Sequence, residues 1–136
     1  MIIKEFISET NKNQMIATLL KHYKVESVKV KQKSMKDHAH YNVDTGTLEL
    51  STKYKIIKNT KVKEFLITII HEIRHAMDAK KYGWKRFKAD YEWEMNYQIS
   101  QDKHQYKDNK YEIEAEQFGQ KNWSKWYTKF KKEGLI

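Results

Sequence analysis

The sequence predicts an α+β fold that occupies residues 1–136 as a single domain. Three observations support this fold class. Apolar residues recur at helical spacing near the N-terminus, and again, more strongly, in the middle of the chain. Between these two regions lie short segments in which apolar and polar residues alternate. The last part of the chain is helical in pattern as well. We therefore expect an N-terminal helix, a small three-stranded antiparallel sheet, a central helix and a C-terminal helix.

The first helix is expected over residues 8–23, where Met15 and Leu19 share one face and Ser8 is a suitable N-cap. Three segments then alternate as half-buried strands do: 25–30, 38–43 and 47–51. A turn signal that contains Gly46 separates the last two segments. Short connections of this kind favour antiparallel pairing.

The strongest helical pattern spans residues 60–82. Its apolar residues form a wide stripe: Val62, Phe65, Leu66, Ile69, Ile70, Ile73 and Met77. Gly83 stands where a helix commonly ends. Residues 84–110 are polar and rich in aromatic side chains, and we expect them to be irregular apart from a short helix near 91–99. Residues 111–130 form the expected last helix.

The composition excludes several kinds of site. The chain has no cysteine, so disulfides, thiolate metal sites and thiol catalysis are excluded. With four glycines it has no glycine-rich phosphate loop. The N-terminal segment meets a charge at Lys4 and lacks the apolar core of a signal peptide. The longest apolar run, 65–70, is too short to span a bilayer. We therefore expect a cytoplasmic protein with no membrane partner.

The formal net charge of +9 raises the question of nucleic-acid binding. The chain has 25 lysines but only two arginines, Arg74 and Arg86. Arginine is the residue that recognises bases and phosphates with two hydrogen bonds at once. The lysines are also spread from Lys4 to Lys132 rather than gathered in one segment. We do not expect nucleic acid as the primary partner, and a basic nucleic-acid-associated domain stays an alternative.

The central helix contains the sequence His-Glu-Ile-Arg-His at residues 71–75, an HExxH motif. Residues four apart lie one turn above each other on the same helix face, so both imidazoles can reach one Zn²⁺ ion. Glu72 is rotated by about 100° from His71, beside the expected ion rather than on it. There it can take a proton from a water molecule. The motif therefore predicts a zinc site with His71 and His75 as ligands and Glu72 as general base.

A catalytic zinc site needs a third protein ligand. The last helix offers several carboxylates, including Glu112 and Glu116 one helical turn apart. Glu112 is our first choice for the third ligand and Glu114 the second. Three further residues remain alternatives: Glu116, His104 and Asp78.

The order of these motifs resembles the gluzincin metallopeptidases, in which HExxH is followed by ExxA and an acidic or amide residue on a later helix. Residues 112–116, Glu-Ile-Glu-Ala-Glu, are similar to that second motif, with Glu where the pattern prefers Asp or Asn. The family includes thermolysin-like enzymes, minigluzincins and small peptidases that cleave phage-type repressors. The resemblance implies that Glu112 is the third zinc ligand and that Glu116 supports a ligand. It also implies hydrolysis of a protein or peptide substrate.

Other residues have two interpretations each. Asp78 either orients a ligand imidazole or forms an ion pair with Arg74 or Lys81. His38 and His40 either form a second metal site or are exposed strand residues. By analogy with the family, segment 47–51 is expected to be the sheet edge that binds an extended substrate.

One tyrosine between the two motifs is expected to donate to the developing oxyanion, and four are candidates: Tyr82, Tyr91, Tyr97 and Tyr106. The alternative to a peptidase at this site is a zinc-binding protein without peptidase activity. In that protein the ion would tie the central helix to the last helix.

Overall fold

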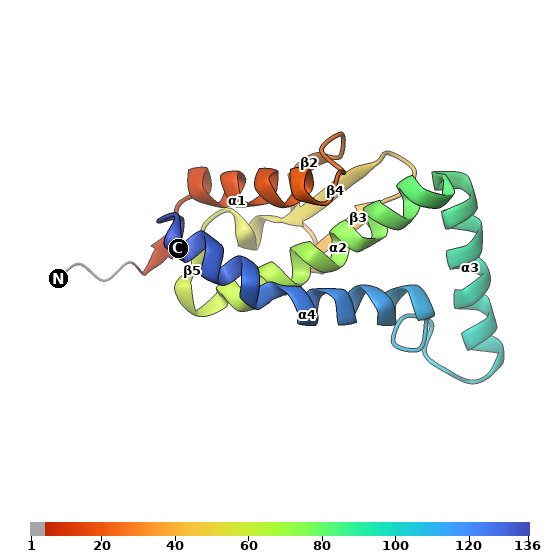
Figure 1. Cartoon of the computed structure of the whole chain (residues 1–136). Helices are drawn as coiled ribbons and strands as arrows, with labels where there is room; N and C mark the ends of the chain where they lie inside the picture. Colours follow the sequence, from red (N-terminus) through yellow and green to blue (C-terminus); the bar gives the residue numbers. More distant parts are fainter. Residues whose placement is uncertain (1–4) are drawn as a thin grey trace.

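Four α-helices and two small sheets make up residues 5–136, the part of the chain that the computed structural model describes (Figure 1). The elements follow one another as β1 (Phe6–Ile7), α1 (Glu9–His22), β2 (Lys29–Lys33), β3 (Ala39–Asn42), β4 (Thr47–Ser51), η1 (Thr52–Tyr54), β5 (Ile57–Lys58), η2 (Asn59–Lys61), α2 (Val62–Tyr82), α3 (Trp84–Ser100) and α4 (Lys110–Lys132). The α+β class is confirmed. Residues 1–4, with the charge at Lys4, lie outside the described residues.

The larger sheet has the strand order β2-β4-β3, and β2 runs parallel to β4 while β3 runs antiparallel to it. The prediction of a three-stranded antiparallel sheet is therefore wrong. Segment 47–51, which is β4, lies in the middle of the sheet, so its prediction as an edge strand is wrong as well. The first strand begins at Lys29 rather than at Val25. The N–H of Val25 closes the turn after α1 on the carbonyl of Leu20, which delays the strand.

A long connection explains the mixed sheet. After β2 the chain passes residues 34–38 before β3 begins at Ala39, and β4 takes the position between β2 and β3. A connection of this length does not impose the antiparallel pairing that a two-residue hairpin would impose. The second sheet is a short antiparallel pair of β1 and β5, with Phe6 opposite Lys58.

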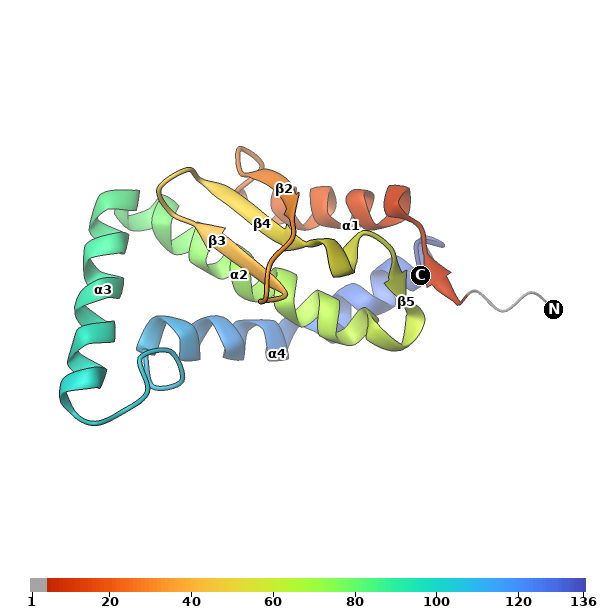
Figure 2. The same cartoon turned by 180° about the vertical axis from the view of Figure 1, so that it is seen from behind.

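Helix α2 runs through the middle of the molecule, with the β2-β4-β3 sheet on one side and α4 on another (Figures 1 and 2). Its predicted apolar stripe is buried: Val62, Phe65, Leu66, Ile69, Ile70 and Ile73 are each at most 1% exposed. Where α4 crosses α2, a Cβ atom at Gly119 would lie 2.8 Å from the carbonyl oxygen of Ile67. Glycine is therefore required at this crossing for the two helices to approach so closely.

Residues 84–100 form one continuous helix, α3, so the prediction of a mostly irregular segment is wrong. Gly83 separates α2 from α3 with a positive φ of 85°, which confirms the predicted end of α2. Helix α3 buries few residues, and the aromatic rings of Trp93 and Tyr97 stack on its exposed side. Without a buried apolar stripe, the sequence gives no periodic signal for this helix. None of the helices in residues 5–136 is long and apolar enough to cross a membrane.

Candidate metal centre

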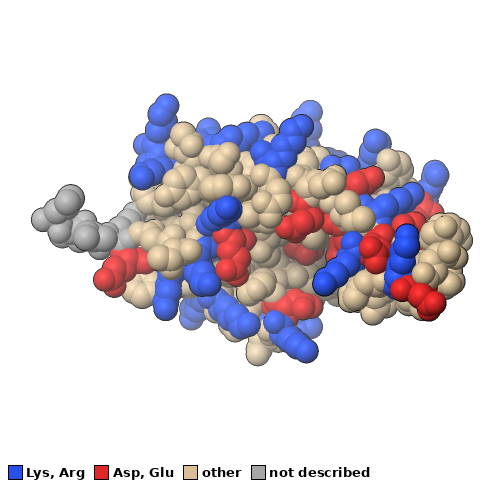
Figure 3. Space-filling model, turned by 90° about the horizontal axis from the view of Figure 1, so that it is seen from below, with Lys and Arg blue, Asp and Glu red and all other residues tan. Residues whose placement is uncertain are grey.

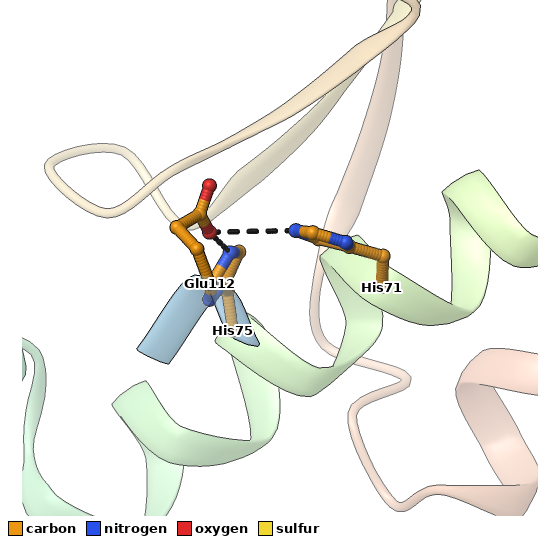
Figure 4. Close-up of side chains that lie close together, drawn as sticks. All are labelled: His71, His75 and Glu112. Carbon is orange, nitrogen blue, oxygen red and sulfur yellow. Dashed lines mark hydrogen bonds and ion pairs between the residues drawn. The ribbon is translucent and has the colours of Figure 1, made fainter. Parts of the chain in front are cut away.

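His71, His75 and Glu112 lie together, and their ligand atoms are all within 4.8 Å of one another (Figure 4). Both histidines come from α2 and Glu112 comes from the first turn of α4. One carboxylate oxygen of Glu112, Oε1, is 3.3 Å from His71 Nε2 and also contacts His75 Nε2. Two imidazole nitrogens and a carboxylate oxygen are a suitable donor set for a divalent transition metal. This group, here the metal centre, could hold a metal ion.

Local structure explains how these side chains come together. The two imidazole rings are one helical turn apart on α2, with centroids separated by 5.1 Å. Asn109 caps α4 by accepting a hydrogen bond from the N–H of Tyr111, which sets where the helix begins. Glu112 then falls in the first turn, where the helix dipole favours a negative charge. The close approach of the helices at Gly119 brings this turn near α2.

Glu116 orients the ring of His71. Its Oε2 lies 2.9 Å from His71 Nδ1, and its other oxygen accepts a hydrogen bond from Gln120. A carboxylate at Nδ1 keeps the proton on that nitrogen, so Nε2 is the ring nitrogen that a metal ion would bind. The contact is the one expected of a residue that supports a metal ligand.

The electrostatics of the centre favour a cation. Burial opposes protonation of His71, but the carboxylates of Glu112, Glu72 and Glu116 outweigh this effect and raise its pKa to about 9. Burial likewise opposes the charge on Glu112, but hydrogen bonds and charges from His71 and His75 outweigh it and lower its pKa to about 2. The surrounding carboxylates therefore stabilise positive charge at His71.

Glu72 lies beside the metal centre and contacts the sheet. The backbone N–H of Tyr41 on β3 donates a hydrogen bond of 2.8 Å to Glu72 Oε2. Removal from water raises the pKa of Glu72, while the neighbouring imidazoles of His75 and His71 act in the opposite direction. The carboxylate is thus tied to the sheet through Oε2.

Three of the four alternative ligands, all except Glu116, lie apart from the metal centre. Glu114 faces Arg74, at 3.7 Å from its guanidinium. His104 belongs to the loop before α4, where its Nδ1 accepts hydrogen bonds from two backbone N–H groups. Asp78 forms the alternative ion pair, with Oδ1 3.4 Å from Arg74 Nε. Its Oδ2 and His75 Nδ1 are buried without a hydrogen-bond partner among the described residues, so Asp78 does not hold a ligand imidazole here.

The histidines near β3 do not form a second centre. His38 precedes the strand and lies 3.4 Å from Glu64, and His40 is exposed. Within residues 5–136, no other group of three metal-ligating side chains meets the same distance criterion.

Tyr91 contacts the metal centre. The sequence alone did not distinguish it from the other three candidate tyrosines. Its ring lies against that of His75, and its hydroxyl lies close enough to Glu112 for the charge of that carboxylate to act on it. Burial and the charge of Glu112 raise its pKa above the ordinary value, so the hydroxyl keeps its proton. Recognising α3 as a helix would have placed Tyr91 and Phe87, four residues apart, on one face toward α2.

Sequence and structure comparisons leave the metal centre as the main guide to function. Comparison of the chain with known protein families, with curated proteins and with solved structures gave no match.

Proposed function

We propose that this protein is a zinc-dependent metallopeptidase of the gluzincin type. His71, His75 and Glu112 hold Zn²⁺, and Glu72 is the general base. The observation that carries the proposal is the position of Glu112 Oε1, which faces the Nε2 atoms of both motif histidines although 37 residues separate it from His75. The donor set also fits zinc, which binds imidazole and carboxylate ligands with a position left open in catalytic sites.

The roles of the chain's own groups follow from their contacts. Bound Zn²⁺ supplies a Lewis acid that polarises a peptide carbonyl and acidifies water. Glu72 Oε1 accepts a proton from the attacking water and then gives it to the leaving nitrogen. The hydrogen bond from Tyr41 N–H holds Oε2 in place, so that Oε1 keeps its direction during both transfers. Glu116 keeps the ring of His71 oriented.

Strand β3 replaces segment 47–51 as the proposed substrate edge. It pairs with β4 on one side only, and the N–H of Tyr41 points away from β4 toward Glu72. An extended peptide placed along this free edge would pass Glu72 with its backbone in the orientation of an added strand. The proposed substrate is therefore a protein or peptide segment in extended conformation.

The test compares zinc content and hydrolysis in wild type and in Glu72→Gln. Wild type is expected to bind about one zinc per chain and to cleave a mixed peptide library, followed by mass spectrometry. Glu72→Gln should keep the zinc and cleave the peptides at least a hundredfold more slowly than wild type, because the amide cannot accept the proton. Full activity of this variant, or a wild type that binds no zinc, would contradict the proposal.

One observation favours a second candidate, a zinc-binding protein without peptidase activity. The metal centre joins α2 to α4, so an ion there would also tie the two helices together. For this candidate, zinc content and stability would respond to loss of a ligand, and no peptide would be cleaved. The nucleic-acid alternative has less support. On the face seen in Figure 3, lysine and arginine side chains are scattered and interrupted by acidic groups.

A further inference from the structure

A groove of about 700 Å³ lies at the N-terminal end of α2, outside the metal centre. Its apolar part is formed by Phe6 and Ile57 of the short β1–β5 sheet and by Ile56, which precedes β5. Phe6 is 49% exposed and Ile56 is 53% exposed, so two large apolar side chains face water at the same place. Neighbouring exposed apolar side chains are typical of a surface that binds a partner.

The rim of this groove is cationic. Lys53, Lys58 and Lys61 line it, and Glu64 is its one acidic residue. Of these lysines only Lys61 has a carboxylate partner within 4.0 Å in the described chain, and that partner is Glu64. Lys53 and Lys58 therefore carry positive charges that no acidic group of residues 5–136 pairs with directly.

The acidic group of the rim is already balanced. Glu64 accepts a hydrogen bond of 2.7 Å from the Tyr54 hydroxyl and lies 3.4 Å from His38 Nε2 and 3.6 Å from Lys61 Nζ. These contacts hold the Glu64 carboxylate against the side of the groove, so it does not pair with the ammonium groups of Lys53 and Lys58. The groove thus combines an apolar surface with an uncompensated positive rim.

We propose that this groove, the lysine groove, binds an acidic peptide segment that carries a large apolar side chain. The apolar side chain would cover Phe6 and Ile56, and flanking carboxylates would pair with Lys53 and Lys58. Lysine on a flexible stem suits carboxylates presented at varying positions, whereas a fixed phosphate is more often held by the planar fork of arginine. Charge complementarity therefore selects an acidic peptide as the occupant.

The lysine groove ends at His38, the residue immediately before β3. His38, which lines the groove, is three residues before Tyr41, the residue that contacts Glu72. This separation is roughly 10 Å of extended chain. Along α2, Glu64 and His71 are seven residues apart and share one face, again roughly 10 Å apart. This inference rests on the proposed function. The groove would select substrates that carry an acidic segment with an apolar side chain about three residues from the cleaved bond.

The experiment measures binding rather than cleavage. Amide chemical shifts of the ¹⁵N-labelled Glu72→Gln variant are followed during titration with the peptide acetyl-Asp-Glu-Leu-Phe-Glu-Asp-amide. The Glu72→Gln substitution removes the proposed general base, so the peptide is not cleaved during the titration. We expect saturable shifts at Phe6, His38 and Ile56. A peptide with serines in place of Leu-Phe, and one with lysines in place of the acids, should each bind at least tenfold more weakly.

Charge reversal tests whether the peptide binds in the lysine groove. Lys53→Glu/Lys58→Glu should weaken binding at least tenfold, while Lys29→Glu/Lys31→Glu, which changes the net charge equally on exposed positions of β2, should change it less than twofold. Amide shifts outside the groove check that both double variants are folded. Absence of saturable shifts in the groove, equal binding of the basic peptide, or equal losses in the two double variants would overturn the proposal. None of these results depends on hydrolysis, so the proposed function is tested separately.

Discussion

Helices α3 and α4 both lie next to α2 and both carry aromatic and acidic residues, but they contribute in different ways. Helix α4 packs along α2, crosses it at Gly119 and places Glu112 between the two histidines. Helix α3 contacts only part of α2 and leaves Trp93 and Tyr97 exposed. Glu112, the proposed metal ligand, comes from the firmly packed helix, and Tyr91, whose ring contacts that of His75, comes from the loosely packed one. Packing against α2, rather than aromatic or acidic content, therefore distinguishes the helix that supplies Glu112 to the metal centre from the helix that does not.

The largest contrast is expected between two tryptophans. Trp126 on α4 is 4% exposed and its indole N–H donates to the Tyr23 hydroxyl, whereas Trp93 on α3 is 64% exposed. Trp126→Ala should lower the free energy of unfolding by about 3–5 kcal/mol through loss of burial. Trp93→Ala should lower it by at most about 0.5 kcal/mol. Urea unfolding of the metal-free proteins measures both, and equal losses would show that α3 is packed as firmly as α4.

Two acidic residues of α4 test which carboxylate binds the metal ion. Glu112→Ala removes the carboxylate that faces both histidines, and we expect zinc affinity to fall more than a hundredfold. Glu114→Ala removes only the contact with Arg74, and affinity should stay within threefold. Competition titration with a zinc chelator measures both constants. Equal affinities of the two variants would mean that the ligand lies elsewhere.

The helix crossing is tested by adding side-chain volume. Gly119→Val would force α4 away from the Ile67 carbonyl, and overpacking of this kind should lower the free energy of unfolding by about 1–3 kcal/mol. Ala89→Val, at an exposed position of α3, is the matched control and should cost no more than about 0.7 kcal/mol of helix propensity. Thermal unfolding compares the two. If Gly119→Val is as stable as wild type, the close approach is not required.

The smallest effect is expected at Tyr91. Tyr91→Phe keeps the ring against His75 but removes the hydroxyl near Glu112, and zinc affinity should fall by about tenfold. Tyr97→Phe, on the exposed side of the same helix, should leave zinc affinity unchanged. Unchanged affinity in Tyr91→Phe as well would assign the tyrosine a packing role alone.

Local patterns predicted the parts of the molecule that local physics determines. The HExxH spacing and the apolar stripe of α2 both follow from helical geometry, so the helix and its facing histidines could be predicted. The choice of Glu112 over Glu114 could only be favoured by resemblance. These residues are rotated by about 200° from each other, and the facing of α4 depends on its crossing with α2.

Strand order and α3 could not be predicted, for different reasons. The parallel pairing of β2 with β4 joins residues such as Val30 and Leu48, and no local pattern reports which strand will lie between two others. Helix α3 exposes Trp84, Trp93 and Tyr97 and buries the polar Glu94 and Gln98 beside Phe87, so it lacks the apolar periodicity by which buried helices are recognised. The contact between Tyr41 N–H and Glu72 involves a backbone group and leaves no mark in the residue types.

The crossing at Gly119 is a point about which α4 can tilt against α2. Glu112 lies seven residues from this point, which is roughly 10 Å along the helix. Rotation of α4 by about 6° around the crossing would move the carboxylate by about 1 Å, a displacement large enough to spoil a coordination geometry. Small changes in the angle between the two helices would therefore be amplified at the metal centre. Zinc affinity should then report tilts of α4 that are too slight to register in the stability of the fold.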